Sequence, residues 1–461
     1  MAALEFVSSS GRDTANPQAT AERLVNFYPE PLALGAQAQY ALKSVLGTEA
    51  FASAEGVFVR ALANVPAYID AGEPADRLIM VDDAKIRSIG ADGVVQTLGT
   101  VGDDENTSIS GNNGIVTIVS DGNYWLWDGT ALTNPTAGVF TNFGAVEFLG
   151  DYTILTEKND RRFCWSALAD PTDLPALNFA TAEARDDILI RPAAIAGNLW
   201  LFKATSIEIW SGTGLSGADA FSRVGGVIET GLKSFGLLSK FPGGAFFIGD
   251  DGIAYITGGS QLQPISTPAV NSAIENCNPT SCFYYEDAGH KFCVIRFRDC
   301  AALVFDIATG AWHERATGED GAWGATTAAR AYGSWRLGGF SGYVRTATRS
   351  NNDVDAPLIR RALSRPLSRG RKPFTVPMLE ILGQMGASDM GREAQVSLRV
   401  SRDAGKTFAP WRNTGLGLLG DYSARAIFRN LGYFTSVAVA EVRVTGAADL
   451  TIWSSAEVEV V

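Results

Sequence analysis

The stretch Arg77-Leu-Ile-Met-Val81-Asp82-Asp83-Ala-Lys85-Ile-Arg-Ser-Ile89 decides the fold. An apolar run enters a short acidic turn, and a run of mixed polarity leaves it. The same order returns in Ile115-Val-Thr-Ile-Val119, Asp121-Gly122 and Tyr124-Trp-Leu-Trp127. Because Asp and Gly readily take the positive φ of a tight turn, each stretch is predicted to be a β-hairpin.

Seven such turns follow one another at steps of about 38 to 47 residues. A period of this length, with several strands in each unit, is typical of a β-propeller. Four short strands fit in one unit, which favours a closed ring over a solenoid. The last unit lacks a clear fourth strand, so six or seven blades are expected. The turns lie near Asp82–Asp83, Asp121–Gly122, Asn159–Asp160, Ala204–Thr205, Asp250–Gly252, Phe297–Asp299 and Gly338–Ser341.

The composition favours an all-β protein. The 461 residues are 46% hydrophobic and 10% aromatic, with 49 Gly and 18 Pro, which provides a large core and frequent turns. The formal charge is −12, from 38 basic and 50 acidic residues. This charge argues against a protein that wraps DNA, whereas a DNA conduit stays compatible because an acidic wall repels phosphates. The charge can equally serve only to keep a large protein soluble.

The strand pattern predicts four segments. Residues 1–55 show little periodicity and are predicted to be an N-terminal arm, and residues 56–350 hold the propeller. Residues 351–376 form a basic, proline-broken linker, which is either solvated or docks on an acidic partner. Residues 377–461 regain strand patterns and are predicted to be a C-terminal β-sandwich. The basic residues of the linker are Arg360, Arg361, Arg365, Arg369, Arg371 and Lys372.

Two kinds of segment are not found in the sequence. No stretch approaches the roughly 18 apolar residues of a membrane-spanning helix. The start, Met-Ala-Ala-Leu-Glu-Phe-Val-Ser, lacks the basic and apolar regions of a secretory signal. No membrane anchor is therefore expected.

A cluster of Cys277, Cys282, His290, Cys293 and Cys300 invites a comparison with zinc sites. The spacing differs from the common Cys-x2-Cys pairs, which favours packing cysteines over a metal site. A hairpin at residues 286–289 would place Cys282 directly opposite Cys293. Five cysteines, an odd number, predict no disulfide framework and indicate synthesis in a reducing cytoplasm.

The sequence offers little enzyme chemistry. His290 and His313 are the only two histidines, and no Gly-x-Ser-x-Gly elbow, phosphate loop or dinucleotide fingerprint stands in a suitable context. We therefore predict no catalytic residue, no metal ligand and no cofactor, and a protein that is not an enzyme. Two alternatives stay open: a sialidase-like or other glycosidase on a propeller, and a generic propeller binding module.

The segment Ser401-Arg-Asp403-Ala-Gly405-Lys-Thr407-Phe408 matches the Asp-box pattern Ser-x-Asp-x-Gly-x-Thr-aromatic. In this hairpin the Asp side chain accepts backbone N–H bonds across the turn, and Gly takes the left-handed position. The box is therefore predicted to be a folding device and not an active site.

The two ends of the chain carry further motifs. Near the N-terminus stand Asn26-Phe-Tyr28-Pro29-Glu30-Pro31 and then Val59-Arg60-Ala61. After the Asp-box stands Gly420-Asp-Tyr422-Ser-Ala-Arg425-Ala-Ile-Phe428-Arg429-Asn-Leu431-Gly432. This order resembles the packaged-DNA stabilisation proteins of short-tailed bacteriophages, the tail hub or nozzle family. Two departures are a Ser44-Val-Leu-Gly47 stretch in place of Thr-Pro-Gly-Leu, and Ala61 in place of Gly.

The resemblance implies a structural role in the virion tail. Members of that family form a ring of six copies below the portal and adaptor, extend the DNA channel and retain the packaged genome. The resemblance also implies docking of tail spikes or fibres and of a terminal plug or needle, and assembly in the host cytoplasm. Passing DNA would be contacted without sequence-specific binding. The stiff segment Pro29-Glu30-Pro31 is expected either to thread along a neighbouring copy or to complete a blade of its own chain.

Overall fold

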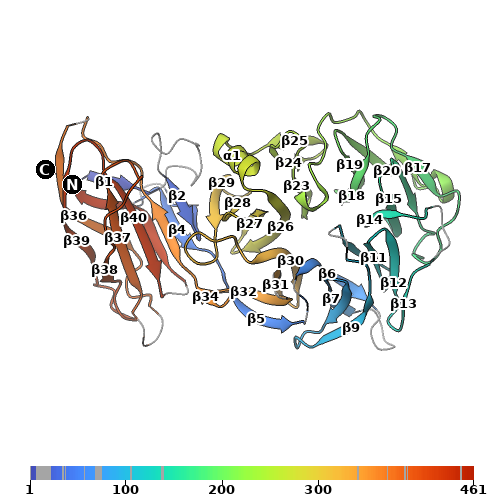
Figure 1. The fold of residues 1–461 in the computed structure, drawn as a ribbon, viewed down its shortest axis with the longest axis horizontal. Coiled ribbons are helices and arrows are strands. Elements are labelled where there is room, and N and C mark those ends of the chain that lie inside the picture. The colour runs from blue at the N-terminus through green and yellow to red at the C-terminus, as the bar shows by residue number, and fades with distance from the viewer. Residues whose placement is uncertain are drawn as a thin grey trace.

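The computed structural model describes residues 2–6, 22–33, 36, 38–54, 56, 58–67, 75–103, 106–135, 140–339, 342–370, 372–388, 391, 393–446 and 449–461. A ring of β-sheet blades occupies one side of an elongated molecule, and a β-sandwich occupies the other (Figure 1). Within the described ranges, no helix is both long enough and apolar enough to span a membrane.

Five blades are self-contained, four-stranded antiparallel sheets whose strands follow one another in the chain. Blade 1 is β6 (Val59–Ala67), β7 (Ala75–Asp82), β8 (Lys85–Ile89) and β9 (Val95–Thr100), and blade 2 is β10 (Ser108–Asn112), β11 (Ile115–Ser120), β12 (Asn123–Trp127) and β13 (Leu132–Thr133). Blade 3 is β14 (Phe143–Leu149), β15 (Tyr152–Glu157), β16 (Arg162–Trp165) and β17 (Phe179–Thr181). Blade 4 is β18 (Leu189–Ile195), β19 (Asn198–Lys203), β20 (Ile207–Gly212) and β21 (Phe221–Arg223), and blade 5 is β22 (Leu238–Phe241), β23 (Gly244–Ile248), β24 (Ala254–Gly258) and β25 (Gln261–Pro264).

The last two blades involve strands from other parts of the chain. Blade 6 is β26 (Pro279–Asp287), β27 (His290–Phe297), β28 (Ala302–Asp306) and β29 (Ala311–Arg315). Blade 7 is β30 (Ala325–Ala331), β31 (Ser334–Gly339) and β32 (Tyr343–Thr348), completed by β5 (Gly47–Ser53). Short helices lie on blades 4 to 6: η1 (Gly217–Asp219), η2 (Phe235–Leu237) and α1 (Pro268–Asn276).

The blade count among the described residues is seven. The missing fourth strand of the last unit is β5, which pairs with β32 from Tyr343↔Ser53 to Thr348↔Gly47. This pairing joins the two ends of the ring, so the last blade is closed by a strand that precedes the first blade in the chain.

Every predicted turn joins the second and third strands of a blade, which confirms the period read from the sequence. At the turn of blade 2, Asp121 and Gly122 have φ values of 50° and 73°, the left-handed conformation that the Asp-Gly pair was expected to take. Phe340 and Ser341, in the seventh turn, lie outside the described residues.

The sandwich has two layers of five main strands each. One layer runs β3-β4-β41-β36-β39, with β1 also paired to β41, and the other runs β2-β35-β40-β37-β38. The strands are β1 (Ala2–Glu5), β2 (Arg23–Val25), β3 (Phe27–Pro31), β4 (Tyr40–Ser44), β35 (Arg360–Leu363), β36 (Phe374–Gly383), β37 (Gln395–Ser401), β38 (Arg412–Gly415), β39 (Ala426–Phe434), β40 (Val439–Thr445) and β41 (Thr451–Glu459). A further hairpin, β33 (Asn352–Asp353) and β34 (Ala356–Pro357), precedes β35.

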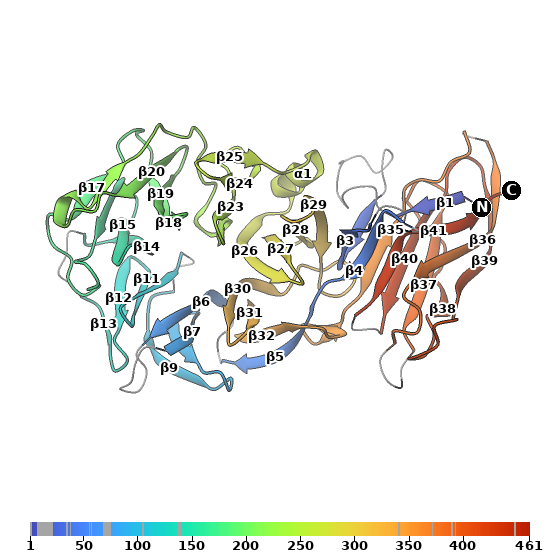
Figure 2. The ribbon, with the colours of Figure 1, turned by 180° about the vertical axis from the view of Figure 1, so that it is seen from behind.

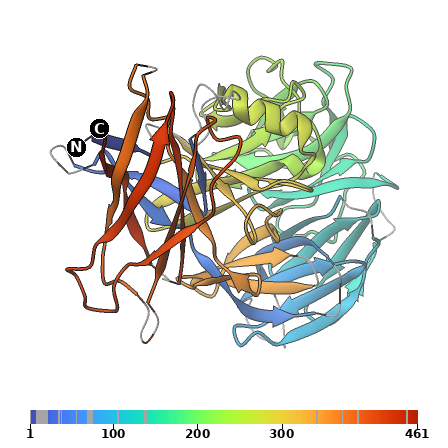
Figure 3. The same cartoon turned by 60° about the vertical axis from the view of Figure 1, so that its left-hand side comes forward.

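Strand β2 joins the two parts of the molecule. It pairs parallel with β29 of blade 6 at Val25↔Glu314 and antiparallel with β35 of the sandwich. Blade 6 and one sandwich layer are therefore a single nine-stranded sheet, β26-β27-β28-β29-β2-β35-β40-β37-β38. Figure 3 shows the N-terminal strands, in blue, placed among the C-terminal strands of the sandwich.

Two predicted segments differ from the structure. The segment predicted as an N-terminal arm, residues 1–55, contributes β1 to β4 to the sandwich and β5 to blade 7, because Leu24, Val25 and Phe27 are apolar and become buried there. The segment predicted as a linker, residues 351–376, contains β35 in the middle of a sandwich layer. Its Arg360 and Arg361 are buried, so neither a solvated linker nor a docking segment describes them; Arg371 lies outside the described residues.

Candidate functional site

Asn26 is the polar centre of the junction between propeller and sandwich. Its side-chain amide donates to the carbonyl oxygens of Ala316 (3.0 Å) and Ile359 (2.7 Å), and its side-chain oxygen accepts from the N–H of Ala316 (3.1 Å). The residue is fully buried and has a φ of 58°, a conformation that Asn tolerates better than most residues. One side chain thus joins β2, the exit of blade 6 and the entry to β35.

Tyr28 continues this junction with an aromatic contact. Its ring is buried and lies 4.8 Å from His290 and 5.2 Å from Phe292, measured between ring centroids. Both partners belong to β27 of blade 6. The contact buries a large ring between two sheets, which fixes the sandwich on this blade.

Pro29 and Glu30 follow on β3, which is the edge strand of its sheet. An edge strand can hold Pro29 because the proline nitrogen has no hydrogen to donate to a neighbouring strand. Glu30 pairs with Lys43 of the adjacent β4 at 2.5 Å. The segment pairs with its own chain in the sandwich, so it does not complete a blade.

Charged side chains bridge the same junction. The Arg23 guanidinium on β2 binds both carboxylate oxygens of buried Glu314 on β29, with an Nη2–Oε2 distance of 2.6 Å, and also Asp320 at 2.8 Å. Burial alone would lower the pKa of Arg23, but the two carboxylates outweigh it and raise that pKa. Arg361 of β35 donates to the Glu319 carbonyl oxygen at 2.8 Å and binds Asp320, both in the segment after β29, and within the sandwich it binds buried Glu441 of β40 at 3.1 Å.

Arg60 lies on the inner strand of blade 1. Its guanidinium donates to the carbonyl of Gly102 (2.6 Å) and the hydroxyl of Thr107 (2.7 Å), both in the connection from blade 1 to blade 2. Arg60 thus holds two blades together, and the structure does not bring it near Asn26 or the C-terminal motifs.

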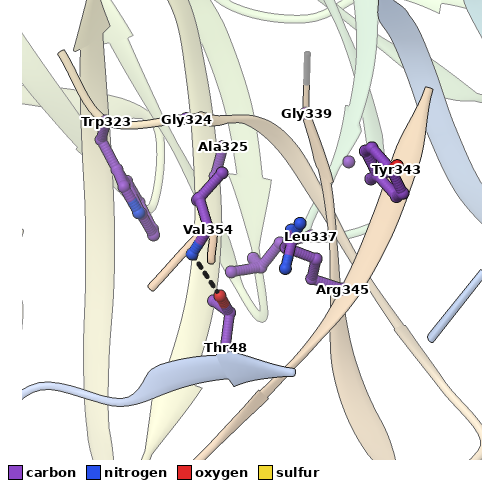
Figure 4. A pocket seen from close by; sticks show the side chains of 10 residues that line it. Thr48, Trp323, Gly324, Ala325, Leu337, Gly339, Tyr343, Arg345 and Val354 are labelled. Atoms are coloured by element: carbon purple, nitrogen blue, oxygen red, sulfur yellow. Dashed lines mark hydrogen bonds between the residues drawn. The ribbon is translucent and has the colours of Figure 1, made fainter. Parts of the chain in front are cut away.

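The seam where β5 closes the ring contains a small cavity of about 20 Å3. Figure 4 shows Thr48 of β5 accepting a hydrogen bond from the backbone N–H of Val354, at 3.0 Å, beside Trp323 and Leu337. A cavity of this size has room for about one water molecule. This seam is therefore a packing contact and no small-molecule site.

The Asp-box lies in the turn after β37 in the sandwich. The Asp403 carboxylate accepts from the Thr407 backbone N–H at 2.8 Å, and the Ser401 hydroxyl accepts from the Gly405 N–H at 2.9 Å. Gly405 has a φ of 90°. The Ser401 and Thr407 hydrogen bonds lower the pKa of Asp403 below its usual range. These are the contacts expected of a self-capping hairpin.

Phe408 leaves this turn and supports a stack of aromatic and basic side chains. The Arg399 guanidinium lies 4.6 Å from the Phe408 ring and 4.3 Å from the Trp411 ring. The Arg443 guanidinium lies 4.5 Å from the centroid of the same Trp411 ring. The stack stiffens the outer part of the sandwich.

The second C-terminal motif forms the loop from β38 to β39 and the strand that follows. Gly420 and Tyr422 are exposed in the loop, and Arg425 after it binds Glu380 with an Nε–Oε1 distance of 2.8 Å. Gly432, with a φ of 99°, lies farther along β39, where the Arg402 side chain approaches it. The C-terminal motifs thus belong to the outer part of the sandwich, distant from the N-terminal motif at the junction.

The cysteine and histidine cluster differs from the prediction. Cys277 and Cys300 form a disulfide that ties the end of α1 to the loop after β27, which the odd cysteine count did not predict. Cys282 pairs with Ile295, and Tyr284 pairs with Cys293, so the predicted direct Cys282–Cys293 pair is wrong by two residues. The hairpin turns at Ala288–Gly289, which sets this register. Among the described residues, no cluster of three His, Cys, Asp or Glu could hold a metal ion.

The two histidines lie close to Tyr28. His290 Nδ1 is 2.7 Å from Asp306 Oδ2, and this hydrogen bond raises the pKa of His290. Burial lowers the pKa of His313 to about 3, and neither of its ring nitrogens has a hydrogen-bond partner among the described residues. Both histidines thus serve the packed junction.

A larger cavity of about 440 Å3 lies between α1, blade 6 and β2. Its size falls in the range of ligand sites, and its carboxylates include Asp299, Glu314 and Asp320. A glycosidase needs one carboxylate poised as an acid and a second as nucleophile or base. Glu314 and Asp320 instead hold the same Arg23 guanidinium, so this pair neutralises a cation.

The residue patterns alone did not identify Arg23, Glu314, Arg361 and Glu441 as members of buried ion pairs. Charged residues within apolar strand patterns are the signal that could have identified them, since a buried charge needs a partner.

Comparisons with known proteins identify the family. A family model described as bacteriophage P22 Gp10, β-propeller, matches residues 20–344, and one described as bacteriophage P22 Gp10, β-sandwich, matches residues 361–461. No curated protein matches the sequence. Among solved structures, the computationally designed Ika8 protein is 13% identical with a TM-score of 0.40, over 74% of this chain and 100% of that one. The WD40 β-propeller domain of Doa1 is 10% identical with a TM-score of 0.41, over 65% of this chain and 96% of that one.

The two family matches together cover most of the chain, and they name the two architectures that the structure contains. The chain therefore belongs to the bacteriophage P22 Gp10 family, the tail hub or nozzle proteins of short-tailed phages, and is a structural protein of the phage tail.

Proposed function

We propose that this chain forms the tail hub or nozzle ring of its virion, with six copies placed below the portal and adaptor. The ring extends the DNA channel and retains the packaged genome. The observation that carries this proposal is the pair of family matches over the propeller and the sandwich. The copy number rests on the family resemblance.

The tightly packed junction between propeller and sandwich supports a mechanical role. A continuous nine-stranded sheet, the buried Asn26 and the Arg23–Glu314 pair join propeller and sandwich into one rigid unit. A component of a pressurised channel benefits from such a unit, because a flexible linker would let the ring open. The propeller and the sandwich of one copy thus act as a single rigid subunit of the ring.

The charge distribution supports a DNA conduit. Residues 59–348, which run from β6 to β32 of the propeller, contain 20 basic and 33 acidic residues, whereas residues 361–461 contain 13 basic and 9 acidic residues. An acidic propeller repels the phosphate backbone, which favours sliding over binding. DNA is accordingly a passing partner without sequence-specific contacts.

The remaining partners follow from the same placement. The adaptor lies above the ring, tail spikes or fibres attach at its periphery, and a terminal plug or needle closes it. The chain works without a cofactor and without catalytic turnover, which fits carboxylates that are engaged in structural ion pairs. Assembly takes place in the host cytoplasm.

The test is whether the chain is a constituent of the particle. Purified virions should contain it together with the portal protein, and particles made without its gene should package DNA and then lose it. A chain missing from virions, or mutant particles that keep their genome, would overturn the proposal. Hydrolysis of host surface glycans by the purified chain would overturn the non-enzymatic part.

A further inference from the structure

The outer edge of the sandwich has a cluster of exposed apolar side chains. Leu418 (58% exposed), Leu419 (59%) and Tyr422 (77%) all lie in the loop between β38 and β39. These strands are the last strands of their two layers, at the side remote from the propeller. We name β38, this loop and β39 the sandwich edge.

The loop of the sandwich edge is built as a rigid structure. Gly420 N–H donates to the Gly386 carbonyl at 3.1 Å, and the Ser388 hydroxyl donates to the Gly417 carbonyl at 2.5 Å. A Cβ on Gly386 would lie 2.8 Å from the Asp421 backbone, so the two segments are in close contact. A loop held in place while its apolar side chains face solvent is preorganised to bind a partner.

A second apolar cluster lies at the far end of the propeller. The loops between the third and fourth strands of blades 3 and 4 expose Leu168, Leu177 (75%) and Leu215, with Phe179 at the start of β17. The Trp165 indole N–H donates to the Gly217 carbonyl at 3.0 Å, which holds the two loops together. We name residues 166–182 and 212–222 the propeller loops.

The two clusters carry opposite charge. The propeller loops contain Asp170, Asp173 and Asp219 and no Lys or Arg. Residues 399–433, which include the sandwich edge, contain six basic and two acidic residues. Of the basic side chains, five are exposed: Arg402, Lys406, Arg412, Arg425 and Arg429.

The two clusters lie at opposite ends of the molecule. Figures 1 and 2 place β38 and β39 at one extreme of the longest axis and β17 at the other. The sandwich edge therefore cannot reach the propeller loops of its own chain. Two different, complementary surfaces on one chain define a heterologous contact, which generates a ring when the rotation closes.

We propose that the sandwich edge of one copy binds the propeller loops of the next copy. The occupant of each surface is a second copy of this chain, because apolar side chains and opposite charge match across the pair of surfaces. The inference rests on the proposed ring and names the two faces that make it.

The test measures the self-association of the wild-type full chain and of three variants by native mass spectrometry and sedimentation velocity. The edge variant carries Leu418→Ser, Leu419→Ser and Tyr422→Ser, and the loop variant carries Leu177→Ser and Leu215→Ser. Val94→Ser, at a residue 64% exposed on blade 1, is the matched control. Circular dichroism and unfolding curves check that each variant is folded.

The edge and loop variants should each weaken self-association by about 30-fold or more, whereas V94S should leave it unchanged. A mixture of the two variants should form a one-to-one dimer and stop there, because each variant keeps one intact face. Self-association that survives in both variants, or a wild-type chain that stays monomeric in solution, would overturn this inference.

A charge exchange gives an independent check. Asp173→Lys and Arg412→Glu should each weaken association by about tenfold, and a mixture or double variant that restores opposite charge should recover most of it. No effect from either reversal would overturn the charge match. These outcomes leave the proposed function in place if virions still contain the chain, so the two failures are distinguishable.

Discussion

Blades 2 to 5 and the propeller–sandwich junction are both β-sheet, but their strands find partners at very different distances along the chain. All four strands of blade 2 lie within residues 108–133. At the junction, β2 near residue 24 pairs with β29 near 314 and with β35 near 362, and at the closure of the ring β5 pairs with β32 near 345. The local blades are specified by short-range turns, whereas these other pairings join strands about 300 residues apart in the chain.

The two regions also differ in the kind of side chain that they bury. Blade 2 buries apolar side chains such as Val116, Ile118 and Tyr124. The junction buries the polar side chains of Asn26 and Glu314, which bind partners on other elements. Apolar packing tolerates substitution, but a buried polar group loses much of its solvation and needs its partner. Junction variants should therefore be more damaging than variants of equal type in the blades.

The largest effect is expected from Arg23→Met. The substitution leaves the Glu314 carboxylate buried without its guanidinium partner, which should lower the free energy of unfolding by about 4 kcal/mol. Urea unfolding followed by tryptophan fluorescence measures the change.

The matched control is Arg185→Met, in the connection from blade 3 to blade 4, whose side chain forms an exposed ion pair with Glu229. Exposed pairs contribute little because water and salt screen them, so this variant should unfold like the wild type. Equal losses in the two variants would contradict the contrast between junction and blade.

A smaller effect is expected from Asn26→Ala. The variant leaves the Ala316 N–H and the carbonyls of Ala316 and Ile359 without this partner and keeps a left-handed φ, which should cost about 3 kcal/mol. Asn159→Ala is the control, because Asn159 has a similar φ of 62° but is exposed at a blade turn. If both variants lost the same stability in urea, the backbone conformation and not the junction would be the cause.

Because His313 is buried, the free energy of unfolding is expected to depend on pH. The folded His313 pKa of about 3 lies below the unfolded value of 6.5, so the unfolded chain binds more protons between these values and stability is lost as the pH falls through this window. The loss should reach about 2 kcal/mol at pH 5. His290 acts in the opposite direction, since its raised pKa favours the folded state at acid pH.

His313→Leu should flatten the acid limb of the stability curve, because the neutral leucine cannot bind a proton. Unfolding curves recorded between pH 7 and pH 4 for both proteins provide the comparison. An unchanged slope in the variant would show that another group titrates in this window.

The sequence predicted the local part of the fold and little of the rest. Turns such as Asp121-Gly122 impose a backbone conformation on their own neighbours, so all seven hairpins could be read. Strand β5 could not be placed, because nothing near Gly47–Ser53 specifies pairing with a strand about 300 residues away. The predicted arm and linker failed for the same reason.

Within the candidate site, too, local contacts could be predicted from the sequence and long-range contacts could not. The Asp-box was predicted in detail because Ser401, Asp403 and Gly405 bond to one another within a single turn. The roles of Asn26 and Tyr28 could not be predicted, since their partners Ala316 and His290 belong to blade 6. The family resemblance marked these residues without saying what they contact.

The smallest effect is expected from Ser401→Ala in the Asp-box. The buried hydroxyl accepts from the Gly405 N–H at 2.9 Å and donates to Asp403 at 2.6 Å, so its loss should cost about 1 kcal/mol in urea unfolding. Ser423→Ala is the control, because Ser423 binds Asp421 at 3.0 Å in an exposed loop and should have less effect. Self-association should survive S401A, since the box is a local contact that stiffens its own turn. Loss of self-association in S401A, with V94S unaffected, would instead make the Asp-box part of the contact between copies.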